Sequence, residues 1–122
     1  MGDADLDRFP GIYAAFNARD IEAVLEALHP DVDWANAMEG GRVHGREELR
    51  AYWGRVFERL DSRHAIEEME RLEDGRIALV VRQVVHEAGG GALIADEFVR
   101  HIFTMEDGLV VRFDVEREDE RG

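Results

Sequence analysis

Three runs in the second half of the chain place apolar side chains at every second position. They cover residues 76–87, 99–105 and 109–115 and are rich in β-branched and aromatic residues. This pattern is typical of strands that bury one face. The glycine-containing segments 89–91 and 106–108 separate the runs and predict hairpin turns. This half therefore predicts an antiparallel sheet built from consecutive hairpins.

The first half instead places apolar residues at helical spacing. The sequence predicts a helix whose buried stripe includes Tyr13, a second helix capped by Asp20, and a third that follows Gly45. A short strand is predicted at 31–36. Segment 64–74 also has helix-like spacing, so periodicity alone predicts a helix there. The order of elements predicts an α+β fold, with helices on one face of an antiparallel sheet and a concave pocket between the layers.

Length and charge restrict the classes of function. The 122 residues suit one domain over 1–122, with acidic tails at about 1–6 and 117–122. Fifteen basic and 28 acidic residues give a net charge of −13, which disfavours binding to nucleic acid or to an anionic membrane. No apolar run approaches the ~20 residues of a membrane span, and the acidic start lacks signal-peptide character. We expect a cytoplasmic location.

Metal and cofactor chemistry find no support in the sequence. Cysteine is absent, which excludes disulfides, thiolate metal ligands and a cysteine nucleophile. The five histidines are dispersed without ligand spacing. The glycines at 89–91 lie between predicted strands and not before a helix, so they indicate a turn and not a phosphate cradle. The sequence predicts no metal and no cofactor.

Four short motifs together resemble a known family. They are YAAFNARD at 13–20, HPD at 29–31, GREEL at 45–49 and DGLV at 107–110. In this order and spacing the chain resembles the nuclear transport factor 2-like (NTF2-like) superfamily, in its SnoaL-like and ketosteroid-isomerase-like branch. The resemblance implies a cone-shaped, strongly curved antiparallel sheet wrapped around the N-terminal helices. It also implies a strand at 64–73, a pocket inside the cone and a homodimer through the convex sheet face.

The resemblance assigns roles to two residues of the first half. Tyr13 matches the tyrosine that donates a hydrogen bond to the oxyanion in ketosteroid isomerase; the alternative is a core side chain. Asn36 falls at the position of the aspartate base of that enzyme. An amide cannot take a proton at neutral pH, so Asn36 is predicted to orient a substrate. The alternative is a turn residue.

His101 is the main candidate on the predicted sheet. The resemblance places a second oxyanion donor within one residue of it, and the apolar alternation favours His101 over Arg100 for the inner face. Histidine titrates near neutral pH and could act as acid or base; the alternative is a core histidine. The aspartate base of SnoaL-like cyclases would fall on Val115. Alternation places the neighbouring Asp114 on the outer face.

Further residues are predicted to contact a ligand. Gln83 and Glu97 face each other across one hairpin; Gln83 would orient the substrate, and Glu97 is either a buried base or a solvated carboxylate. Apolar side chains at positions on the predicted helices and strands would form the pocket wall. These wall residues are Trp34, Tyr52, Trp53, Phe57 and Val99. The alternative for the aromatic residues is packing in the core.

Two classes of function follow from these residues. The first is a proton-transfer enzyme, an isomerase, dehydratase or cyclase, which acts on a small hydrophobic molecule and uses Tyr13 and His101 as catalytic residues. The second is a non-catalytic module of the same fold that binds a ligand or forms a structural dimer. Loss of the carboxylate at both familiar base positions favours the second, and the polar set Tyr13, Gln83 and His101 favours the first.

Overall fold

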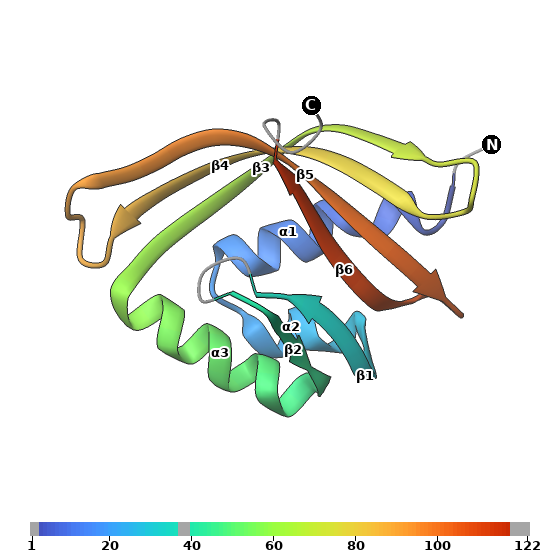
Figure 1. Ribbon diagram of the computed structural model, residues 1–122, viewed down its shortest axis with the longest axis horizontal. Coiled ribbons are helices and arrows are strands. Elements are labelled where there is room, and N and C mark those ends of the chain that lie inside the picture. Colours follow the sequence, from blue (N-terminus) through green and yellow to red (C-terminus); the bar gives the residue numbers. More distant parts are fainter. Residues whose placement is uncertain (1–2, 37–39, 118–122) are drawn as a thin grey trace.

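The computed structural model describes residues 3–36 and 40–117 and has the predicted α+β architecture (Figure 1). The first half contains all the helices and two short strands, and the second half contains strands alone. In chain order the elements are η1 (Leu6–Arg8), α1 (Phe9–Asn17), α2 (Ile21–Glu26), β1 (Leu28–Ala35), β2 (Arg42–His44), α3 (Gly45–Arg59), β3 (Leu60–Arg71), β4 (Ile77–Glu87), β5 (Leu93–Glu106) and β6 (Leu109–Arg117).

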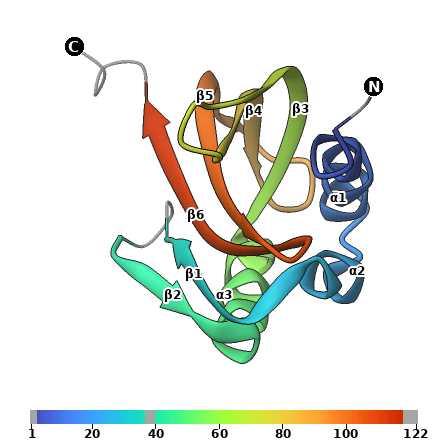
Figure 2. The ribbon, with the colours of Figure 1, turned by 90° about the vertical axis from the view of Figure 1, so that its right-hand side faces the viewer.

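A six-stranded sheet arches over the helices (Figures 1 and 2). Its strand order is β2-β1-β6-β5-β4-β3. All neighbouring strands are antiparallel except β1 and β6, which are parallel. Parallel neighbours need a long connection, and here the chain passes through α3 and four strands before it returns to β1. The predicted curved sheet is confirmed, with this one parallel pair.

Local chemistry explains where the helices begin and end. Pro10 lies in the first turn of α1, where its missing N–H is not needed. Asp20 caps α2, as predicted, because its Oδ1 accepts a hydrogen bond from the Ala23 N–H at 3.3 Å. Gly45 opens α3 at a φ of 84°, which favours glycine. None of the helices in the described residues is long and apolar enough to cross a membrane.

Residues 60–71 form strand β3, so the helix that periodicity predicts for 64–74 is wrong. The strand implied by the family resemblance is confirmed as far as Arg71. A register shift between Ile66 and Glu68 explains the misleading spacing. Ile66 pairs with Val81 and Met69 pairs with Leu79, two buried positions on one face of β4. Because Glu67 is the extra residue, side chains three apart share a face, as they would on a helix.

The inner face of the sheet packs on the helices to form the core. Leu79, Val81, Gln83 and Val85 of β4 are buried there, as the alternation predicts. On β6 the buried residue near the hairpin is Val110, whereas strict alternation from residue 109 to residue 115 predicts Val111 there. The register shift opposite Thr104 and Met105 leaves Val111 unpaired and moves Val110 to the inner face.

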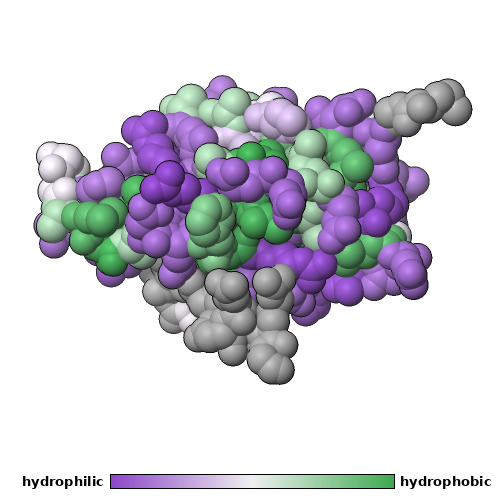
Figure 3. Space-filling view, turned by 90° about the horizontal axis from the view of Figure 1, so that it is seen from above, coloured by the Kyte–Doolittle hydropathy of each residue, from purple (hydrophilic) through white to green (hydrophobic). Residues whose placement is uncertain are grey.

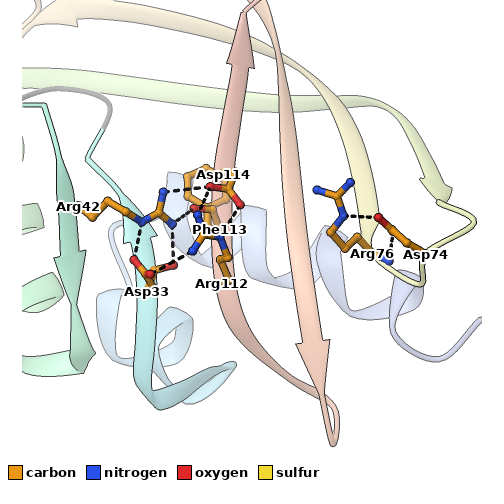
Figure 4. A network of polar contacts seen from close by, with 7 residues as sticks. All are labelled: Asp33, Arg42, Asp74, Arg76, Arg112, Phe113 and Asp114. Atoms are coloured by element: carbon orange, nitrogen blue, oxygen red, sulfur yellow. Dashed lines mark hydrogen bonds and ion pairs between the residues drawn. The ribbon is translucent and has the colours of Figure 1, made fainter.

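The outer face of the sheet is largely charged. Arg42 of β2 bonds to Asp33 of β1 at 2.5 Å and to Asp114 of β6 at 2.9 Å (Figure 4). Arg112 of β6 bonds to the same two carboxylates. Asp114 therefore lies outside the cone, as the alternation predicts, and these four residues tie three strands together.

Candidate functional site

A cavity of about 90 Å³ lies between the helices and the inner face of the sheet. Its wall is mostly aromatic and aliphatic, and α1, α2, α3 and every strand except β2 contribute to it. Several of the residues predicted to form a ligand site line it. These are Tyr13, Trp34, Tyr52, Trp53, Phe57, Gln83 and His101.

Tyr13 and His101 meet at the cavity wall. The Tyr13 hydroxyl lies 2.5 Å from Nδ1 of His101, and their side chains come from α1 and β5. Both residues are buried, with exposed fractions of 8% and 6%. Burial raises the pKa of Tyr13 well above its usual value of 10.0, so the phenol keeps its proton. A protonated phenol can donate to Nδ1, and a neutral imidazole that accepts there carries its proton on Nε2.

His64 is a cavity residue that the sequence analysis missed. Its Nε2 lies 3.0 Å from Oε1 of Gln83, its partner position on β4. Burial, and to a smaller extent the charge of Arg19, lowers the pKa of His64 from 6.5 to about 4, although the Gln83 bond opposes this shift. His64 is therefore neutral at physiological pH. The sequence could have indicated His64 only through its pairing with Gln83, and that pairing requires residues 60–71 to be recognised as a strand.

Asn17 fixes this part of β3 against the helices. Its side-chain amide donates to the carbonyl oxygen of His64 at 2.8 Å, and its Oδ1 accepts from the His64 N–H at 3.0 Å. Two such bonds to one backbone residue hold the strand to the end of α1. Asn17 lies in the YAAFNARD motif, so part of that motif positions β3.

Ser62 also lines the cavity and was not predicted. It is 1% exposed, and its Oγ is the one buried side-chain polar atom of the described residues that has no hydrogen-bond partner. A buried hydroxyl without a partner is unfavourable, so its presence needs an explanation.

Three residues predicted to contact a ligand do not line this cavity: Asn36, Glu97 and Val99. The backbone of Asn36 bonds to Gly40 and Gly41 across the β1–β2 connection. Glu97 lies opposite Gln83, as predicted, but it is only half-buried, because a carboxylate favours solvent over an apolar wall. Val99 is 3% exposed and packs into the core.

The polar groups of the cavity define its chemistry. The described residues that line it include no carboxylate, and the polar side chains are phenol, imidazole, amide, hydroxyl and indole groups. Within the described part of the chain no group of three or more His, Asp or Glu side chains could hold a metal ion. The arrangement can bind a mostly apolar molecule and direct hydrogen bonds at one or two of its atoms.

Comparison with known proteins identifies the family. The model of the SnoaL-like domain matches residues 11–113. A crystal structure of an NTF2-like protein of unknown function from Burkholderia pseudomallei is 27% identical, with a TM-score of 0.83, and the alignment covers 98% of this chain and 95% of that one. TerC, co-crystallized with polyporic acid, is 26% identical, with a TM-score of 0.80 and coverage of 96% and 93%.

More distant similarity concerns the fold alone. A Mycobacterium tuberculosis protein in complex with estradiol-17β-hemisuccinate has a TM-score of 0.78 at 15% identity, with 93% of each chain covered. No curated protein sequence matches this chain significantly. Since the SnoaL-like model spans most of the chain and the structural neighbours share its fold, the protein belongs to the SnoaL-like domain family of the NTF2-like superfamily.

Proposed function

We propose that the protein catalyses proton transfer on a small hydrophobic ring compound that carries a carbonyl oxygen. The observation that carries this proposal is the Tyr13–His101 hydrogen bond of 2.5 Å at the wall of an apolar cavity. A relative at 26% identity, TerC, was co-crystallized with polyporic acid, which supports a ring compound as the ligand.

The bonded pair supplies a fixed donor to the substrate. With Nδ1 occupied by the Tyr13 hydroxyl, His101 carries its remaining proton on Nε2. A carbonyl oxygen that accepts this N–H gains negative charge when a neighbouring carbon transfers its proton to the unprotonated ring nitrogen of His64, whose ring centroid lies 5.6 Å from that of His101. A hydrogen bond in a buried apolar site strengthens as that charge develops, and one such donor accelerates a reaction by roughly 10²–10³. Tyr13 holds the ring of His101 in the required tautomer.

Exchange of carbon-bound protons tests the proposal without knowledge of the natural substrate. The probe is 3-cyclohexen-1-one in heavy water, and ¹H NMR follows loss of its α-protons and migration of its double bond. We expect the wild-type protein to accelerate both, and His101→Ala to lower the rate by about a hundredfold. His44→Gln is the matched control because His44 is exposed and outside the cavity. Equal rates in His101→Ala and wild type would contradict the proposal.

A second function, ligand binding without catalysis, has one observation in its favour. No carboxylate of the described residues lines the cavity, so a strong proton acceptor of the usual kind is missing there. Saturable binding of the same ketone with no proton exchange would support this function. The two proposals therefore share the cavity and differ in one measured rate.

We also propose a homodimer through the outer sheet face. Ile94 and Phe98 of β5 are large apolar side chains that are 54% and 55% exposed. Phe98 pairs with the exposed Arg82, which places it on the outer face. Figure 3 shows hydrophobic and hydrophilic residues interleaved on this face. Large apolar side chains that are exposed and rimmed by polar residues are found at protein interfaces.

A further inference from the structure

We propose that Ser62 and His64 form a hydroxyl-binding subsite, and that the ligand of this cavity is therefore a hydroxylated ring compound. The inference rests on the proposed function, because it takes the cavity to be the ligand site. It specifies the chemical group of the ligand that the β3 side of the cavity, formed by Ser62 and His64, recognises. The two residues lie two apart on β3 and both face the cavity.

His64 contributes a hydrogen-bond acceptor. The amide oxygen Oε1 of Gln83 can only accept, so the His64 nitrogen at 3.0 Å from it, Nε2, carries the proton. The other ring nitrogen, Nδ1, then has a lone pair, and no described residue donates to it. His101 differs, because its Nδ1 is already bonded to the Tyr13 hydroxyl. The acceptor that remains for a ligand on this wall is His64 Nδ1.

Ser62 contributes a donor. Its Oγ is buried and has no partner among the described residues. Such a hydroxyl destabilises the empty protein, and a ligand that bonds to it removes the penalty. Rotation about the single Cα–Cβ bond is enough to redirect the hydroxyl. Ser62 and His64 pair with Val85 and Gln83, alternate buried positions of β4, so they share the inner face.

The combination of one donor and one acceptor selects the ligand group. A ligand hydroxyl can donate to His64 Nδ1 and accept from Ser62 Oγ at the same time. A ketone or ether oxygen accepts only and leaves Nδ1 without a partner, and a methyl group leaves both without one. Unsatisfied buried groups discriminate strongly between such analogues. The rest of the wall is apolar and suits a ring.

A matched pair of probes tests the subsite directly. The probes are 4-fluorophenol and 4-fluorotoluene, which differ in one substituent, and ¹⁹F NMR titration gives both dissociation constants. We expect the phenol to bind wild-type protein about tenfold more tightly.

Ser62→Ala should lower this preference severalfold. The double variant His64→Leu, Gln83→Leu should abolish it, and the double change leaves no buried amide unpaired. Thr104→Ala, which removes a hydroxyl at a β5 position opposite Arg112 of β6 and outside the cavity, should keep the preference.

The possible results separate this inference from the proposed function. Equal affinity for both probes overturns the hydroxyl subsite and leaves the cavity as a ligand site. A preference that survives the double variant but disappears in Tyr13→Phe also overturns it, because the hydroxyl would then lie at the Tyr13–His101 pair. Binding of neither probe contradicts the cavity itself and therefore both proposals. Ser62→Ala supplies an independent readout, since it should unfold at a higher urea concentration than wild type when no ligand is present.

Discussion

Two histidines of the cavity wall use different ring nitrogens in their hydrogen bonds within the protein. The Nδ1 atom of His101 is bonded to the Tyr13 hydroxyl, whereas Nε2 of His64 donates to Gln83 and leaves a lone pair on Nδ1. Their ring centroids are 5.6 Å apart. The two imidazoles therefore lie close together on one wall of the cavity and differ in which ring nitrogen bonds to a neighbouring side chain.

The lowered pKa of His64 predicts a loss of stability in mild acid. Unfolded histidine takes up a proton near pH 6.5, but folded His64 does so only near pH 4. Between these values the unfolded state binds more protons, so unfolding becomes easier as the pH falls. We expect His64 to lower the free energy of unfolding by about 2 kcal/mol between about pH 8 and about pH 5. Urea unfolding at the two pH values measures this change.

The double variant His64→Leu, Gln83→Leu provides the comparison. Between about pH 8 and about pH 5 its free energy of unfolding should fall by about 2 kcal/mol less than that of wild type, because it lacks His64 and keeps the other histidines. Ion pairs with arginine lower the carboxyl pKa values of Asp96 and Asp114 from 3.8. Protonation of these carboxyls therefore changes the stability only in more acidic solution. An identical pH dependence in both proteins would contradict the burial of a neutral His64.

Sequence reasoning found part of the site and missed the rest for a structural reason. Tyr13 and His101 were predicted together, because the family resemblance and strand alternation indicated the same inner face. Ser62 and His64 were missed because the bulge at Glu67 gives β3 a helix-like spacing. No sequence pattern indicates a role for Ser62, because only the packed structure shows that its hydroxyl lacks a hydrogen-bond partner.

At the level of elements, bulges shape the sheet. Four strand pairs contain a register shift, and bulges bend and twist the strands that carry them. The alternation of side chains predicted the existence and faces of β4 and β5 well, because each pairs over most of its length. It placed Val111 instead of Val110 in the core of β6, because a single extra residue reverses the faces and composition does not reveal it.

The edge of the sheet depends on Arg42. This side chain bonds to Asp33, to Asp114 and to the carbonyl oxygen of Phe113, so it joins β2, β1 and β6. We expect Arg42→Ala to lower the free energy of unfolding by about 1–2 kcal/mol in urea titration. Arg76→Ala is the matched control, because Arg76 bonds only within its own turn, to Asp74 (Figure 4), and should lose less than about 0.5 kcal/mol. Equal losses would show that the Arg42 network does not hold the strands.

On the scale of the whole molecule, the two faces of the sheet differ in composition and in what they contact. The inner face encloses the cavity, and the outer face combines charged networks with exposed apolar side chains. The net charge of −13 opposes self-association, so a dimer depends on apolar contact. The family resemblance predicted both the fold and a dimer through the convex face. Contacts within one chain determine the fold, whereas a dimer depends on contacts between two chains.

Native mass spectrometry at micromolar concentration measures the dimer. We expect twice the chain mass of 13.9 kDa for wild type. Phe98→Glu should give the monomer mass, because it places a charge in the apolar contact. Ala51→Glu adds the same charge on an exposed position of α3, away from the sheet, and should remain dimeric. A monomeric wild-type protein would contradict the proposal.

The central claim is that the cavity between helices and sheet is the ligand site, and the two tryptophans test it most directly. Trp34 and Trp53 are the only tryptophans of the chain, and both line the cavity. We would titrate ¹⁵N-labelled protein with 3-cyclohexen-1-one and follow the two indole N–H resonances. The account predicts that both shift and saturate together, with weaker binding in Tyr13→Phe. Indole resonances that stay unchanged at saturating ketone would contradict it.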